Sequence, residues 1–240
     1  MLKLGKWIGA GLGWTIGGPI GALLGFAFGS FVDASDFEAY RSSPVNTTTG
    51  DFVVSFLVLI AAVMKADQKV MKSELGYVKN YLVTAFGESE AADMLRILRD
   101  ILKQDIPVKD VALQIRTRMD YPSRLQLLHL VYGIAMSDGT VSKEEIHKID
   151  QIGFDLGISN SDILSLKAMY VKSTDWAYQV LEVDPGAPNE AIKRAYRQMA
   201  MKNHPDKISY LGEEIRQKAQ EKFQKINEAY TAIRKERDMT

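Results

Sequence analysis

The side chains able to do chemistry are few in this chain of 240 residues, and the most suggestive pair is His204 and Asp206. A histidine and an aspartate could be two members of a catalytic triad, which also needs a serine nucleophile on a sharp turn. No serine lies in such a turn motif. The chain has no cysteine and three histidines, which excludes disulfides, thiolate metal sites and a histidine-rich metal centre. We therefore expect a binding protein and not an enzyme.

Helical patterns on both sides of this pair must position it. Residues 190–203 have apolar side chains at helical spacing, and Asn189 is expected to cap that helix. Residues 213–235 carry a second apolar stripe in a highly charged segment, and residues 175–183 fit a shorter amphipathic helix. The loop containing His204 therefore lies between two long helices.

The last third of the chain contains, in order, the motifs D-W-A-Y-x-V-L-x-V, I-K-R-A-Y-R-x-M-A, H-P-D-K and K-F-Q-x-I-N-E-A-Y. Together they closely resemble the J domain of DnaJ-type co-chaperones, because the tripeptide is flanked by both helices in register. The resemblance implies an antiparallel helical hairpin whose H-P-D loop binds a DnaK-type ATPase chaperone. The expected partner-binding residues are Lys193, Arg194, Tyr196, Arg197, Lys202, His204, Pro205, Asp206 and Lys207.

The basic side chains of this region suit an acidic protein surface better than a nucleic acid. The whole chain has 30 Lys and Arg against 30 Asp and Glu, so its net charge is zero. A nucleic-acid partner is not expected from such a balance. Two residues depart from the J-domain pattern: Gln198 stands where a basic residue is common, and Asn203 replaces the usual aromatic before His204.

The centre of the chain is helical throughout, with no strand alternation. A faint repeat pairs Asp67 and Glu74 with Asp138 and Glu145, 71 residues later. Ser142 and Glu145 also form an S-x-x-E capping box. The expected helices are 52–66, 71–86, 89–104, 108–119, 122–137, 142–156 and 160–171.

The two Asp-containing turns resemble those of the TerB-like tellurite-resistance domain, an all-helical fold. The resemblance implies that Asp67, Glu74, Asp138 and Glu145 are candidate ligands of a divalent cation such as Ca²⁺ or Mg²⁺. The alternative is structural, since an Asp favours a turn and a Glu favours a helix N-terminus. We favour the structural reading, because two carboxylates per turn fall short of the six to eight ligands of Ca²⁺.

The N-terminal segment is rich in glycine and lacks charge from residue 7 to residue 32. A bilayer needs about 20 apolar residues in a helix, so this segment is long enough to cross, either as one span or, broken near Pro19, as a re-entrant hairpin. A stripe of glycines at four-residue spacing lets another helix approach closely, so we expect a homo-oligomer. The stripe consists of Gly5, Gly9, Gly13, Gly17, Gly21, Gly25 and Gly29.

The domain order resembles that of the DjlA family of membrane-anchored bacterial co-chaperones. The expected domains are a membrane segment (1–34), a linker (35–50), a TerB-like helical bundle (51–171) and a J domain (172–240). The fold class is therefore all-α. The resemblance implies a location at the bacterial inner membrane, with both folded domains in the cytoplasm beside ATP and the DnaK-type partner.

A second function remains open. The glycine stripe could assemble a structural or sensing membrane protein, in which the TerB-like bundle detects metal or envelope stress and the J domain is vestigial. The two functions differ in whether the chain stimulates a DnaK-type ATPase.

Replacing Gly13, Gly17 and Gly21 with Leu should preserve membrane insertion while separating the packed helices, because leucine inserts well but holds two backbones apart. The expected result is a smaller particle mass in detergent than that of the wild-type protein. An unchanged mass would show that the glycines are not the oligomer interface.

Overall fold

A computed structural model describes residues 18–25, 49–65, 72–136, 142–171 and 173–239 of the chain. These residues form helices and connecting turns with no strand among them, so the expected all-α class is confirmed. The helices are α2 (Thr49–Met64), α3 (Lys72–Phe86), α4 (Glu88–Ile101), α5 (Val108–Arg118), α6 (Tyr121–Ala135), α7 (Lys143–Asp155), α8 (Asn160–Ala168), α9 (Trp176–Val180), α10 (Asn189–Lys202), the 3₁₀ helix η2 (Pro205–Leu211) and α11 (Glu213–Glu236).

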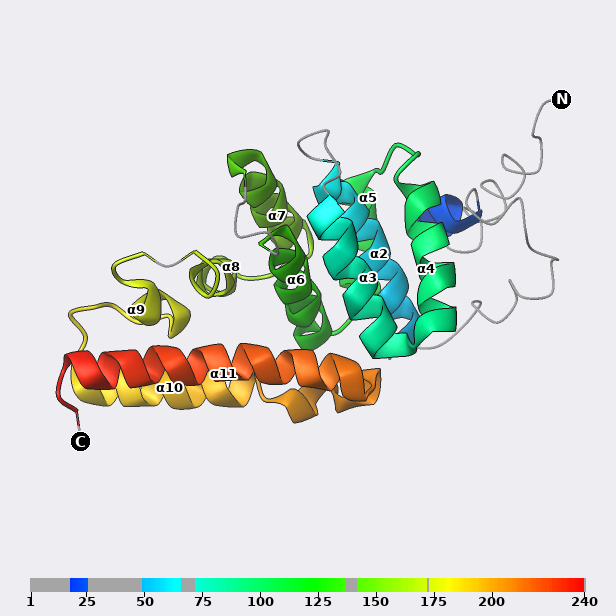
Figure 1. The fold of residues 1–240 in the computed structure, drawn as a ribbon. Helices are drawn as coiled ribbons and strands as arrows, with labels where there is room; N and C mark the ends of the chain where they lie inside the picture. The colour runs from blue at the N-terminus through cyan, green and yellow to red at the C-terminus, as the bar shows by residue number, and fades with distance from the viewer. Residues whose placement is uncertain (1–17, 26–48, 66–71, 137–141, 172, 240) are drawn as a thin grey trace, which may run out of the picture.

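The helices α2–α8, here called the bundle, are arranged around α2 (Figure 1). Helix α2 contacts α4, α5, α6 and α7, and its apolar side chains are buried on every side. A helix that is apolar all round has to be covered all round. Below the bundle in Figure 1, α10 and α11 run side by side, and together with η2 they form what is here called the hairpin.

Several bundle helices are capped at their N-termini by side chains. The Asp120 carboxylate accepts a hydrogen bond from the Ser123 amide at the start of α6 (2.8 Å). At the start of α7, Ser142 and Glu145 form the expected capping box, with both reciprocal hydrogen bonds present. Each cap satisfies amide groups that a helix N-terminus leaves without an intrahelical acceptor.

The prediction that Asn189 caps α10 is wrong. Pro188 occupies the N-cap position and Asn189 is the first helical residue. The Asn189 side chain instead accepts a hydrogen bond from Arg237 Nη1 (3.2 Å), near the end of α11. A proline is suited to this boundary because its missing amide has no helical partner to lose.

Residues 18–25 form a short helical segment packed on the bundle. The Ile20 amide donates to Gln114 Oε1 (3.0 Å), and Gln104 Nε2 donates to the Leu23 carbonyl (3.2 Å). Gly21 and Gly25 of the glycine stripe lie in this segment, while Gly5, Gly9, Gly13, Gly17 and Gly29 lie outside the described residues. Within the described ranges, no helix combines the length and the apolar character needed to span a bilayer.

The hairpin packs on the bundle through a face of α11 that carries lysines. Lys225 Nζ lies 3.6 Å from the centre of the Tyr170 ring and donates to the Met169 carbonyl (3.2 Å). Lys222 is 3% exposed, and in the described part of the chain no carboxylate forms an ion pair with it. Burial lowers the Lys222 pKa from its usual value to about 7. This lysine is therefore an unfavourable element of the interface.

Replacing Lys222 with Met should stabilise the protein. The unfolded chain binds a proton at Lys222 more readily than the folded chain, because the folded-state pKa is lowered from 10.5 to about 7. The free-energy cost of burying Lys222 is fully present below pH 7 and decreases as the pH rises towards 10.5. We expect the variant to gain about 1–3 kcal/mol in the free energy of unfolding at pH 7.

Denaturant unfolding at pH 6, 7 and 9 measures this difference, with Lys235→Met, at an exposed position of the same helix, as the matched control. The gain in the free energy of unfolding of Lys222→Met over the wild type should be smaller at pH 9 than at pH 7. No gain at pH 7, or a gain that grows with pH, would contradict the burial of a neutral lysine.

Candidate functional site

The H-P-D loop lies where the hairpin turns back on itself. Helix α10 ends at Lys202, and η2 begins at Pro205. Pro205 is buried, whereas the side chains of His204 and Asp206 are 52% and 74% exposed. The proline therefore attaches the loop to the protein interior while the two polar side chains face solvent.

Local hydrogen bonds define the shape of the loop. The Asp206 amide donates to His204 Nδ1 (3.3 Å), so the imidazole caps η2. Ser209 Oγ donates to the Asp206 carbonyl (2.9 Å). The His204 ring also contacts the edge of Phe223 on α11, with ring centres 5.9 Å apart. Asp206 Oδ2 also lies 3.5 Å from His204 Nδ1, and both side chains remain largely exposed to solvent.

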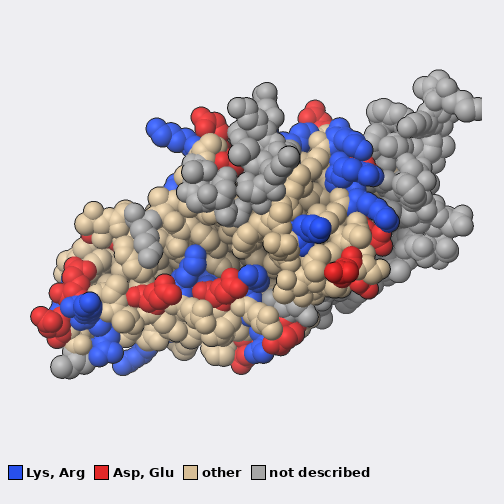
Figure 2. Space-filling model, in the orientation of Figure 1, with Lys and Arg blue, Asp and Glu red and all other residues tan. Residues whose placement is uncertain are grey.

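The exposed basic side chains of this region are Arg194 and Arg197 on α10 and Lys207 directly after the H-P-D loop. Lys193 is half-buried and lies 3.5 Å from Glu190. On the face shown in Figure 2, acidic and basic side chains are interspersed along the hairpin helices at the lower edge. Such a surface provides local positive charge without the extended single-sign stripe typical of nucleic-acid binding.

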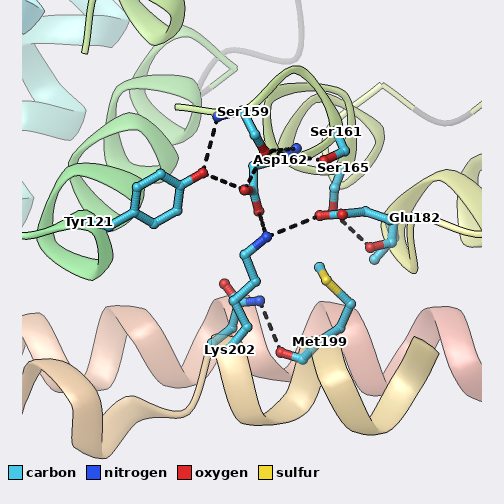
Figure 3. Close-up of polar contacts among 10 residues, drawn as sticks. Tyr121, Ser159, Ser161, Asp162, Ser165, Glu182, Met199 and Lys202 are labelled. Carbon is cyan, nitrogen blue, oxygen red and sulfur yellow. Dashed lines mark hydrogen bonds and ion pairs between the residues drawn. The ribbon is translucent and has the colours of Figure 1, made fainter. Parts of the chain in front are cut away.

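Tyr196 and Lys202, both expected to bind the partner, make polar contacts with other elements of this chain. The Tyr196 hydroxyl donates to Asn227 Oδ1 (3.0 Å), and its ring stacks on Tyr230 with centres 4.1 Å apart. Tyr196 therefore joins α10 to α11. Lys202 points towards the bundle, where its ammonium lies 2.5 Å from Asp162 Oδ1 and 3.6 Å from Glu182 Oε1 (Figure 3).

Asp162 is the centre of a polar network that the sequence did not reveal. Its carboxylate accepts hydrogen bonds from Tyr121 (2.5 Å) and Ser159 (2.6 Å) in addition to the Lys202 ion pair (Figure 3). Burial opposes ionisation of Asp162, but the bonds from Lys202, Ser159 and Tyr121 outweigh it and lower the Asp162 pKa. The S-x-x-D spacing of Ser159 and Asp162 indicates a helix cap and carries no signal of the contact with the hairpin.

Of the four candidate metal ligands, Glu145 is the one whose side chain the structure describes. Asp67 and Asp138 lie outside the described residues, as does the side chain of Glu74. Glu145 is buried, and its carboxylate accepts a hydrogen bond from the Ser142 amide (2.8 Å). In the ranges that the structure covers, no three His, Asp or Glu side chains gather as they would around a metal ion.

Comparisons with known families match almost the whole chain. The model of the tellurite resistance protein TerB matches residues 54–168, and that of the DnaJ domain matches residues 176–238. The model of the co-chaperone DjlA transmembrane domain matches residues 1–46. The three matches occur in the order expected from the sequence. This chain is a DjlA-like J-domain protein.

Curated relatives support the same family. The chain is 26% identical to the co-chaperone protein DjlA of Legionella pneumophila, over 95% of this chain and 94% of that protein. It is 25% identical to DjlA of Coxiella burnetii over 98% of both chains, and 49% identical to the chaperone protein DnaJ of Fusobacterium nucleatum over 23% of this chain and 14% of that one. No solved structure gives a significant match. These relatives support a co-chaperone role and a link to the membrane for the DjlA-like chain.

The structure gives the unusual Asn203 of this DjlA-like chain a local role. Asn203 is buried at the C-terminal end of α10, and its Nδ2 donates to the Met199 carbonyl (3.0 Å). The same carbonyl accepts the Asn203 backbone amide (3.0 Å), so the side chain adds a second hydrogen bond at the end of the helix. An aromatic residue has no side-chain group that could replace this bond in the same way.

Replacing Asn203 with Ala should destabilise the hairpin by about 1 kcal/mol, since one buried hydrogen bond is lost. Thermal or denaturant unfolding measures the change. Asn80→Ala, at an exposed position of α3, is the matched control and should have little effect or a slightly stabilising one. Equal stability of the two variants would mean that the Asn203 bond contributes nothing.

Proposed function

We propose that this chain is a membrane-anchored co-chaperone that recruits a DnaK-type chaperone through His204, Pro205 and Asp206 and stimulates its ATPase. The observation that carries the proposal is the H-P-D loop itself. It combines a buried proline with two exposed polar side chains, and it follows α10, which carries the exposed Arg194 and Arg197.

The chain itself does no bond-breaking chemistry in this proposal. Exposed cations steer an acidic partner surface towards the loop, which favours fast and salt-sensitive association. The loop then binds one conformation of the partner better than another and shifts the partner towards the state that hydrolyses ATP. A ligand shifts such an equilibrium only by its differential affinity for the two states.

The N-terminal segment provides the membrane attachment in this proposal, and the glycine stripe provides the contact between copies of the chain. The bundle and the hairpin lie in the cytoplasm of a bacterial cell, where the ATP-dependent partner operates. Several hairpins held together at one membrane site raise the effective concentration of loops available to a client-bound partner. No cofactor is required, although the TerB-like turns leave a divalent cation as a secondary proposal.

The decisive experiment measures ATP hydrolysis by a purified DnaK-type chaperone with increasing amounts of the full-length protein in detergent or lipid. We expect the wild-type protein to stimulate hydrolysis and the His204→Gln variant to return the rate to its basal level, because the imidazole is exposed at the loop tip. His147→Gln, at an exposed position of α7, is the matched control and should stimulate like the wild type.

If neither the wild type nor His204→Gln stimulates the ATPase, the structural or sensing alternative with a vestigial J domain gains support. Equal stimulation by both would mean that the loop is not the site of contact.

A further inference from the structure

Contacts between the hairpin and the bundle lie on both sides of the H-P-D loop. Just before the loop, Lys202 forms the ion pair with Asp162 of α8 (2.5 Å). Just after it, the Tyr210 hydroxyl donates to the Asp120 carboxylate and lies 2.8 Å from Ser123 Oγ. These two sets of contacts are here called the loop anchors. The loop is therefore attached to the bundle at each end.

The bundle side of each loop anchor is itself held in place. Asp162 is buried, and its Oδ2 accepts hydrogen bonds from Tyr121 and Ser159, while its Oδ1 faces Lys202 (Figure 3). Asp120 is the N-cap of α6, where its other carboxylate oxygen accepts the Ser123 amide. Groups fixed by a second set of hydrogen bonds orient whatever binds to them.

The loop anchors hold the loop without covering it. The His204 and Asp206 side chains remain 52% and 74% exposed, while the Lys202 side chain is 35% exposed and that of Asp162 is 3% exposed. Arg194 and Arg197 are exposed as well. An inhibitory contact would bury the binding groups, so this geometry favours positioning over inhibition.

We propose that Lys202 and Tyr210 are positioning residues, through which the TerB-like bundle presets the H-P-D loop for its DnaK-type partner. This inference rests on the proposed function. A free loop samples many backbone conformations, and binding must then supply the free energy of ordering it. A loop that is already ordered binds with an apparent affinity closer to its intrinsic affinity, because a larger fraction of molecules is competent to bind.

The bundle side of the first loop anchor is tested by Asp162→Asn, which removes the charge that pairs with Lys202 and leaves the oxygen that Ser159 and Tyr121 can use. The second is tested by Tyr210→Phe, which removes only the hydroxyl. Neither position is in the partner-binding set. Matched controls are Asp93→Asn, on the exposed surface of α4, and Tyr230→Phe, whose ring stacks within the hairpin.

Each full-length variant is titrated into the DnaK-type ATPase assay, and hydrogen exchange of the loop amides is followed in the same protein without partner. We expect the concentration for half-maximal stimulation to rise about threefold or more in each test variant, with an unchanged plateau. The loop amides should exchange faster, while the controls match the wild type. A variant that no longer folds would instead lower the plateau of ATPase stimulation and show faster hydrogen exchange throughout the hairpin.

The outcomes separate this inference from the proposed function. If the wild type stimulates in a His204-dependent way but the test variants keep its half-maximal concentration and loop exchange, the positioning inference is wrong and the co-chaperone function stands. A lower half-maximal concentration in the variants would make the loop anchors inhibitory and also overturn the inference. If the wild type does not stimulate at all, the proposed function fails, and the inference fails with it.

Discussion

The burial of helix α2 is the constraint on which the rest of the structure depends. From Phe52 to Met64 this helix carries no charged side chain, so water must be excluded from its whole circumference. Four bundle helices cover most of it, and η2 of the hairpin contacts it as well. The element that begins at Pro205 of the H-P-D loop therefore contributes to the cover of the bundle core. Polar contacts such as the Lys202–Asp162 ion pair then help to select one orientation of the hairpin on the bundle.

Periodicity and motif spacing were enough to predict the all-α fold, the order of the helices and the position of the H-P-D loop. These features are encoded locally, since a helix shows its buried face and its caps within a few residues. The Ser142–Glu145 capping box was predicted for the same reason. The N-cap of α10 was predicted wrongly. Asn189 is a residue type that favours the N-cap position, but its side chain accepts a hydrogen bond from Arg237, which lies 48 positions away in the chain.

The surface that joins hairpin and bundle could not be predicted from one sequence. Lys222 and Lys225 belong to a helix rich in charge, where lysines normally face solvent. Lys222 is buried and Lys225 packs on the Tyr170 ring because one domain docks on the other. Lys202 has the residue type and position expected of a partner-binding cation, and only the tertiary structure shows that it faces Asp162. A pattern identifies which residues are charged, whereas the identity of the opposing surface depends on segments far away in the chain.

The docking of the hairpin has a kinetic consequence. A binding domain on a loose tether can rotate to meet its partner while the rest of the protein stays still. Here Lys202 and Tyr210 tie the ends of the H-P-D loop to the bundle, so under the proposed function a productive encounter would depend on how the whole bundle is turned towards the partner. Orientational constraints of this kind reduce the fraction of collisions that lead to a complex. They also make the angle of approach a criterion by which one chaperone can be distinguished from another with a similar surface.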